Sequence, residues 1–249
     1  MLSDPAFLAV AVLAVVLIGV SKSGFGGAMG SLSIPLMSLC VAAPQAAAIM
    51  LPILLVLDVT GLAVCRGKGD RANLRILIPG GLVGIVLGAL TFHFVEARWI
   101  KGMIGVEALL FGVDRLRQVN AAGECRAPAV VPGLFWSSIS GFTSFISHAG
   151  GPPILQYLLP QGLDRVRTVG TTTIYFAVIN FAKLLPYGFL GLLDTSNPAT
   201  SLALLPAAPV GYWLGLKLLK HLPRAPFNLV IAVAMLLTGL KLLADAWSG

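Results

Sequence analysis

The sequence is poor in charged side chains. Asp, Glu, Lys and Arg make up 11% of its 249 residues, against about 25% in an ordinary soluble domain. These four residue types are absent from three runs, residues 23–57, 127–163 and 195–216. Each run is longer than the roughly 20 apolar residues that a membrane-spanning helix needs. Because this content of charged residues is too low to cover a globular protein with a water-exposed polar surface, the composition predicts an integral membrane protein.

Cysteine and enzyme motifs are also scarce. Cys40, Cys65 and Cys125 stand alone in or beside apolar segments, which excludes a disulfide framework or a zinc cluster and predicts packing residues. The sequence has no phosphate-binding loop, no His-Glu-x-x-His, no Cys-x-x-Cys and no Gly-x-Ser-x-Gly elbow. We therefore expect no enzyme, no catalytic residue, no cofactor and no metal site.

The basic residues that are present give a net charge of +7. They lie in short clusters between apolar runs, as in the cytoplasmic loops of membrane proteins, and this pattern argues against nucleic acid as a partner. The first apolar run, residues 6–20, has no basic segment before it and no typical cleavage site after it, so we interpret it as retained.

Hydropathy predicts an all-α, multi-pass membrane protein without a soluble domain. Two elements, 6–41 and 128–160, are interrupted by glycine-rich motifs. The uninterrupted spans are predicted near residues 44–64, 74–94, 99–118, 166–188, 199–217 and 227–246.

The chain also resembles itself at an offset of 127 residues, which predicts two repeats, 1–125 and 126–249. The shared spacing is Pro-x-x-x-x-Gly-x-x-Leu-Gly. The matching pairs are Pro79/Pro206, Gly84/Gly211, Leu87/Leu214, Gly88/Gly215 and Gly112/Gly239.

Loop charges indicate that the two repeats have opposite orientations. Basic residues cluster at 66–75, after the 44–64 span, whereas the equivalent loop at 190–201 has no Lys or Arg. Equivalent loops therefore lie on opposite sides of the membrane. This arrangement requires the elements 6–41 and 128–160 to enter and leave on one side, as re-entrant hairpins or paired helices. Inverted repeats with broken helices are typical of secondary transporters, which bind substrate near the midplane.

The first glycine-rich motif favours an anion. Its candidate binding residues are Ser21, Lys22, Ser23, Gly24, Gly26 and Gly27. Each glycine disfavours helix continuation by about 1 kcal/mol, so we expect the backbone to unwind here. The restarting helix points its positive end into the break, and the lysine and hydroxyls add to the attraction for an anion. The alternative is close packing of small residues, with the lysine extended to the interface.

The second motif follows the same pattern in the second repeat. Its candidates are Ser147, His148, Gly150 and Gly151, followed by two prolines that suit the first turn of a new helix. The two restarting helices would share one site. His148 could donate to the anion or carry a coupled proton, or it could be a neutral structural histidine.

Polar residues inside predicted spans are candidates for coupling or gating. They are Asp58, Glu107, Asn180 and Lys183. Inverted symmetry would bring Asp58 and Lys183 toward a central cavity, where Asp58 could pair with Lys22 or Lys183. A bundle ion pair or an interfacial position is the competing interpretation, especially for Glu107, and Asn180 could simply bridge two helices.

Two four-segment halves, each opening with a Gly-Gly element followed by proline, resemble the TauE/SafE family of bacterial membrane anion exporters. The resemblance rests on Gly24, Gly26 and Gly27 with Pro35, and on Gly150-Gly151-Pro152. It covers essentially the whole chain. It implies a multi-pass inner-membrane transporter that exports sulfite or a related sulfonate by alternating access.

Three other functions fit the same residues. An anion channel would have the same site chemistry with uncoupled flux, and an uptake transporter would move the same anion inward. An intramembrane sulfur-relay enzyme would use Cys40 or Cys65.

Overall fold

The computed structural model describes residues 4–24, 26–27, 30, 33–37, 40–41, 43–92, 96–118, 126–192, 196–221 and 224–247. All regular secondary structure in these ranges is helical, as the composition predicts. The helices are α1 (Pro5–Gly24), α2 (Ser33–Met37), α3 (Ala43–Val64), α4 (Arg71–Thr91), α5 (Ala97–Gln118), α6 (Val130–Ser147), α7 (Gly151–Leu158), the 3-10 turn η2 (Leu159–Gln161), α8 (Arg165–Phe189), α9 (Ser196–Leu204), α10 (Ala207–His221) and α11 (Arg224–Trp247).

All but one of the predicted uninterrupted spans correspond closely to these helices. Five helical segments in the described ranges are long and apolar enough to cross a membrane, namely Pro5–Gly24, Gln45–Val64, Arg71–Thr91, Val130–Ser147 and Arg165–Phe189. Large apolar side chains also lie on the outside, such as Val86 and Leu90 on α4, which are 57% and 67% exposed. Exposed apolar faces on long apolar helices are what a lipid environment requires.

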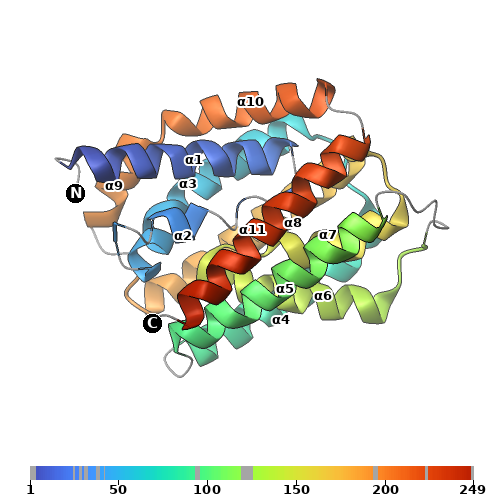
Figure 1. Ribbon diagram of the computed structural model, residues 1–249, viewed down its shortest axis with the longest axis horizontal. Coiled ribbons are helices and arrows are strands. Elements are labelled where there is room, and N and C mark those ends of the chain that lie inside the picture. Colours follow the sequence, from blue (N-terminus) through green and yellow to red (C-terminus); the bar gives the residue numbers. More distant parts are fainter. Residues whose placement is uncertain are drawn as a thin grey trace.

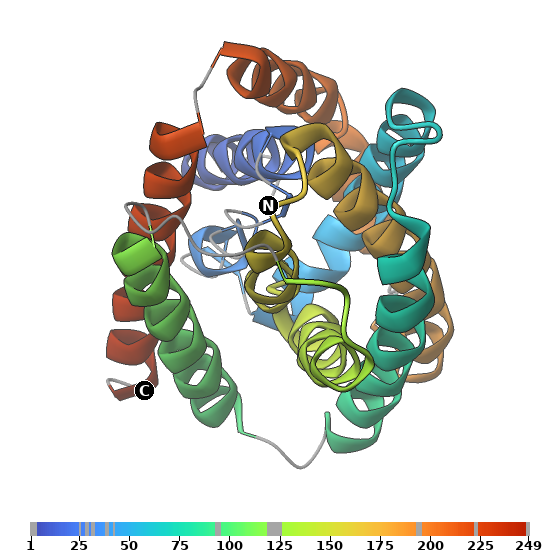
Figure 2. The ribbon, with the colours of Figure 1, turned by 90° about the vertical axis from the view of Figure 1, so that its right-hand side faces the viewer.

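Both glycine-broken elements form hairpins. The short helix α2 returns along α1, since the hydroxyl of Ser33 donates to the carbonyl of Ala14 at 3.1 Å. Helix α7 returns along α6, and the hydroxyl of Tyr157 donates to the carbonyl of Ala129 at 3.2 Å. Helix α2 thus returns to the middle of α1, and α7 returns to the start of α6. Figure 2 shows α2 and α7 in the interior, enclosed by the longer helices.

Three close pairs of helices join residues of the first predicted repeat to residues of the second: α1 with α10, α4 with α6, and α5 with α11. The last pair crosses the front of the molecule in Figure 1. Gly84 and Gly211, which match at the 127-residue offset, lie against backbone carbonyls of α6 and α1, where a Cβ atom would collide. A Cβ on Gly112 would lie 3.0 Å from a carbonyl oxygen of α11, and one on Gly239 would lie 2.8 Å from a carbonyl oxygen of α5. The matching glycines therefore serve equivalent helix contacts.

The continuous span predicted at 199–217 is wrong, because the chain breaks between α9 and α10. Leu205 and Pro206 form a turn there. Proline lacks the amide hydrogen of a helix interior, and it disfavours helical geometry at the residue before it. Pro79, the matching residue of the first repeat, lies inside the unbroken helix α4.

Candidate functional site

The first break begins after Gly24, the last residue of α1. Gly26 and Gly27 have positive φ angles of 59° and 91°, which side-chain-bearing residues adopt only at a cost. A Cβ on Gly27 would also lie 3.1 Å from the ring of Phe176. These two glycines therefore let the backbone turn tightly against α8, as the sequence predicts.

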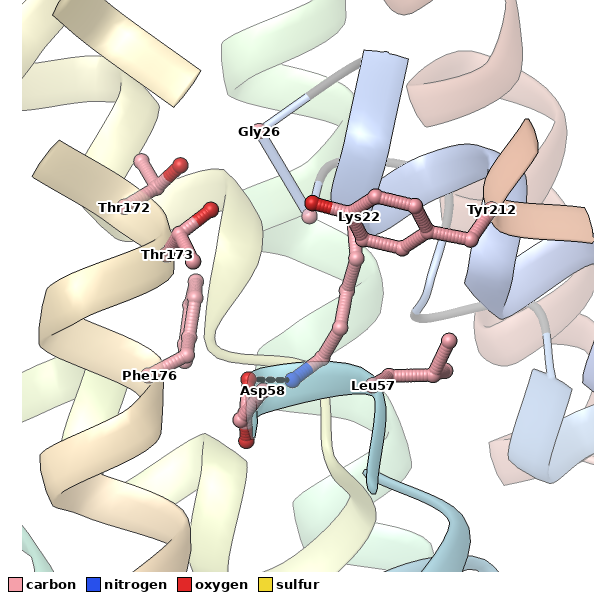
Figure 3. A pocket seen from close by; sticks show the side chains of 9 residues that line it. Lys22, Gly26, Leu57, Asp58, Thr172, Thr173, Phe176 and Tyr212 are labelled. Atoms are coloured by element: carbon pink, nitrogen blue, oxygen red, sulfur yellow. Dashed lines mark hydrogen bonds and ion pairs between the residues drawn. The ribbon is translucent and has the colours of Figure 1, made fainter. Parts of the chain in front are cut away.

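Lys22, in the last turn of α1, forms an ion pair with Asp58 of α3. Asp58 is 1% exposed, and its second oxygen accepts a hydrogen bond of 2.6 Å from the amide of Asn180 on α8. Of the two partners predicted for Asp58, the structure selects Lys22. Figure 3 shows the lysine reaching across to this carboxylate, with Phe176 and Tyr212 on either side.

The second break follows α6. His148 caps this helix in the left-handed conformation, with φ 53° and ψ 22°, and it is the one non-glycine residue with positive φ in the described ranges. Its Nε2 lies 3.0 Å from the carbonyl oxygen of Ala47. A carbonyl only accepts, so Nε2 carries the hydrogen and Nδ1 is left as the acceptor.

Lys183 supplies the donor that Nδ1 requires. Its Nζ lies 2.9 Å from Nδ1 of His148 and donates to the carbonyl and hydroxyl of Ser144 at 2.9 and 3.0 Å. The side chain is completely buried. Lys183 therefore belongs to the second break, whereas Asp58 belongs to the first.

The two breaks meet. A Cβ on Gly27 would lie 3.7 Å from the Cα of Gly151, the first residue of α7. Two small cavities adjoin this contact, and Lys22, Gly27 and Phe176 line both of them. The first cavity also contacts Asp58 and Tyr212 (Figure 3).

The second cavity lies between the ion pair and the second break. Its polar lining includes Lys22, Asn180, Ser144 and His148, and its volume is about 20 Å³. A cavity of this volume has room for about one water molecule.

Two buried hydroxyls, those of Ser21 and Tyr212, form no hydrogen bond of ordinary geometry among the described residues. Tyr212 lines the first cavity, and its hydroxyl interacts with the thiol of Cys65, a weak partner. Both side chains are at most 3% exposed, and a buried hydroxyl without a partner is costly. Tyr212 was not predicted as a site residue. Its polar tip within the uncharged run 195–216 was the signal that could have identified it.

Other predicted residues have partners away from the cavities. The hydroxyl of Ser23 donates to the carbonyl of Gly19, and that of Ser147 to the carbonyl of Thr143, each within its own helix. The side chain of Glu107 lies outside the described part of the structure, so its predicted role stays a prediction.

Helix α7 offers few amide donors to an anion. Its first residues are Gly151, Pro152 and Pro153, and proline has no N–H. Side chains around this break, rather than a row of free amides, supply most of its donors.

Neither Cys40 nor Cys65 lines the two cavities. Cys65 is buried, whereas Cys40 is exposed, so the predicted packing role is wrong for Cys40. Cys125 lies outside the described residues. The structure brings together no group of three His, Cys, Asp or Glu residues that could hold a metal ion within the described ranges.

Comparison with known proteins agrees with the membrane architecture. The sulfite exporter TauE/SafE family matches residues 11–242. A probable inner membrane transporter protein, TsaS of Comamonas testosteroni, is 25% identical over 176 residues, which cover 69% of this chain and 71% of that protein. No solved structure matches. The family and this relative are transporters and not enzymes, and the chain belongs to the sulfite exporter TauE/SafE family of membrane transporters of sulfur-containing anions.

Proposed function

We propose that this chain exports sulfite, or a related small sulfur-containing oxyanion or sulfonate, across the bacterial inner membrane by alternating access. The observation that carries the proposal is the buried ion pair of Lys22 and Asp58 at the meeting point of the two breaks. An ammonium group held by one carboxylate can exchange that partner for a substrate anion.

The neighbouring groups suit an oxyanion with several oxygens. Lys22 provides charge, Ser21 provides a buried hydroxyl that has no partner among the described residues, and Tyr212 provides a buried hydroxyl that interacts only with the weakly hydrogen-bonding thiol of Cys65 among the described residues. Asn180 holds the second oxygen of Asp58, so the carboxylate keeps a donor when Lys22 turns to the substrate. The anion therefore takes the place of Asp58 as the partner of Lys22, and it accepts hydrogen bonds from the hydroxyls of Ser21 and Tyr212.

The two halves, 1–125 and 126–249, act as inverted repeats in this proposal. Two observations support the repeats. The first helix of each half packs against a helix of the other half, α1 on α10 and α6 on α4, and the equivalent loops at 66–75 and 190–201 differ in charge. In transporters of this plan, one part rocks against the other around a fixed site.

The size of the cavities favours a transporter over an open channel. A volume of about 20 Å³ admits a water molecule but not a three-oxygen anion. Passage of substrate therefore requires the lining elements to move. The outward direction follows the family description, and an uptake mode would use the same residues.

The test is sulfite efflux from proteoliposomes that contain purified protein. Lys22→Met should abolish efflux, whereas Lys241→Met, a matched change at a half-exposed ion pair with Asp245 on α11, should not. Efflux from Lys22→Met at the wild-type rate would show that Lys22 does not bind the substrate.

Tyr212→Phe tests the hydroxyl separately. It removes one oxygen whose partner in the described structure is the weakly hydrogen-bonding thiol of Cys65, so folding should change little. A hydrogen bond to a charged ligand contributes about 1.5–3 kcal/mol, so we expect the KM for sulfite to rise at least tenfold. An unchanged KM would remove Tyr212 from the site.

A further inference from the structure

Lys183 is a completely buried lysine with no carboxylate among its hydrogen-bond partners. It lies on α8 one turn after Asn180, the residue that holds Asp58. A single helix therefore connects the ion pair of the first break to the lysine of the second break.

Among the interior side chains that the structure describes, the charges do not balance when both lysines carry a proton. Lys22 and Asp58 neutralise each other. Lys183 then adds one positive charge whose direct partners, Ser144 and His148, are neutral. An unpaired buried charge is unfavourable, and two events relieve it: loss of the proton or arrival of a monovalent anion.

The partners of Lys183 accommodate it with or without its proton. The ammonium form donates to three acceptors, the carbonyl and hydroxyl of Ser144 and Nδ1 of His148. The neutral amine donates to two of them and accepts from the third, because the Ser144 hydroxyl can rotate and donate. No partner has to move between the two forms.

We propose that Lys183 is the proton-binding site of the transporter, taking up one proton with each monovalent anion and releasing both on the opposite side of the membrane. This inference rests on the proposed function, because it concerns the ion that is coupled to the substrate.

Ser144 connects the proton site to the cavity. Its hydroxyl contacts Nζ of Lys183, and its side chain lines the second cavity beside His148. A hydronium ion in that cavity gives a proton to the Ser144 oxygen, whose own proton passes to the lone pair of Nζ, and a water molecule remains. The reverse transfer returns the proton to water on the other side, so protons and charge balance over one cycle.

The groups that face Lys183 favour it over His148 as the proton carrier. Among the described side chains, Lys22 of α1 and Asp58 of α3 act on Lys183 through their charges, and His148 at the end of α6 contacts it directly. Tyr187, one turn further along α8, lies beside the ring of His148. Protonated His148 would direct a donor from Nδ1 at the lysine while Nε2 stays on the carbonyl of Ala47. Lys183 meets no such conflict.

The first experiment measures sulfite efflux from proteoliposomes under imposed membrane potentials, at an acidic pH where hydrogen sulfite dominates. Wild-type efflux should be the same at inside-negative and inside-positive potentials, because an anion and a proton together carry no charge. In Lys183→Arg, whose guanidinium keeps its proton, the two rates should differ by about tenfold or more.

The outcomes of this experiment distinguish a failure of the proton site from a failure of the proposed function. Wild-type efflux that follows the potential would overturn the proton site and leave the transport function intact. A complete absence of sulfite efflux from the wild type would instead contradict the proposed function.

A second measurement keeps the inference testable if the arginine variant is inactive. Calorimetric titration of solubilised protein with sulfite, in buffers of different ionisation enthalpy, counts the protons taken up on binding. The wild type should take up one proton per anion, and zero uptake would overturn the proposal.

The serine relay is tested with two variants of α6. Ser144→Ala should slow efflux at least tenfold. The control Ser138→Ala removes a hydroxyl that donates a hydrogen bond to the carbonyl of Gly80, and it should not slow efflux. Equal rates would remove the serine relay.

Discussion

Replacing Asp58 with asparagine tests whether the ion pair stabilises the fold. The substitution preserves shape but leaves the ammonium of Lys22 without a counter-charge. Breaking a buried ion pair costs about 3–5 kcal/mol. Asp58 is 1% exposed and the side chain of Lys22 is 11% exposed, so we expect the lower end, about 3 kcal/mol.

The double variant Lys22→Met/Asp58→Asn separates charge balance from packing. With both charges removed, nothing buried is left uncompensated, so about 2 kcal/mol of the loss should return. Thermal unfolding of detergent-solubilised protein should show the single variant roughly 6–12 °C below the wild type, with the double variant between them. Additive effects of the two substitutions would refute the idea that each charge compensates the other.

Transport should behave differently from stability in this series. We expect none of the three variants, Lys22→Met, Asp58→Asn and the double, to export sulfite, because each lacks either the anion-binding ammonium or the carboxylate that releases it. Restored stability without restored efflux would therefore separate the folding role of the pair from its role in transport.

Three further predictions concern single positions. Gly84→Ala should destabilise the fold by about 1–3 kcal/mol, because the new methyl group meets a backbone carbonyl of α6; Gly188→Ala on α8, where nothing lies within 4 Å, is the matched control for the same unfolding assay. His148→Gly should be more stable than His148→Ala by about 1–2 kcal/mol, because both remove the imidazole and alanine alone keeps the left-handed penalty; equal unfolding temperatures would argue against that backbone conformation. Maleimide should label exposed Cys40 faster than buried Cys65 without loss of sulfite efflux, and inactivation by labelling would revive a thiol mechanism.

The positions of most helices could be predicted because they follow from local composition. Apolar runs with few charges predict α3, α4 and α8 to within a few residues. Glycine clusters predict both breaks for an equally local reason, the cost of continuing a helix through them. The error at α9 and α10 is also local, because hydropathy averages over Pro206 as if it were any apolar residue.

The partners of the buried polar residues could not be predicted in the same way. Asp58 had two candidate lysines, and the choice depends on how α1 and α8 approach α3, which no spacing along the chain encodes. The contact of Lys183 with His148 depends on the left-handed cap that turns the imidazole toward α8. Tyr212 escaped prediction because a tyrosine in an apolar run is commonly a packing residue.

The position of the ion pair explains how a substrate anion could drive movement. A Cβ on Gly24 would lie 2.7 Å from the carbonyl oxygen of Gly215, so α1 packs closely against α10. In the proposed cycle, these two helices move as a unit. Lys22 belongs to that unit, whereas its partner Asp58 belongs to α3, which packs against α8. Motion of one unit against the other must lengthen the ion pair. In the proposed cycle, an anion that takes over Lys22 removes the main electrostatic link between the units, so substrate binding itself lowers the barrier to the opening step.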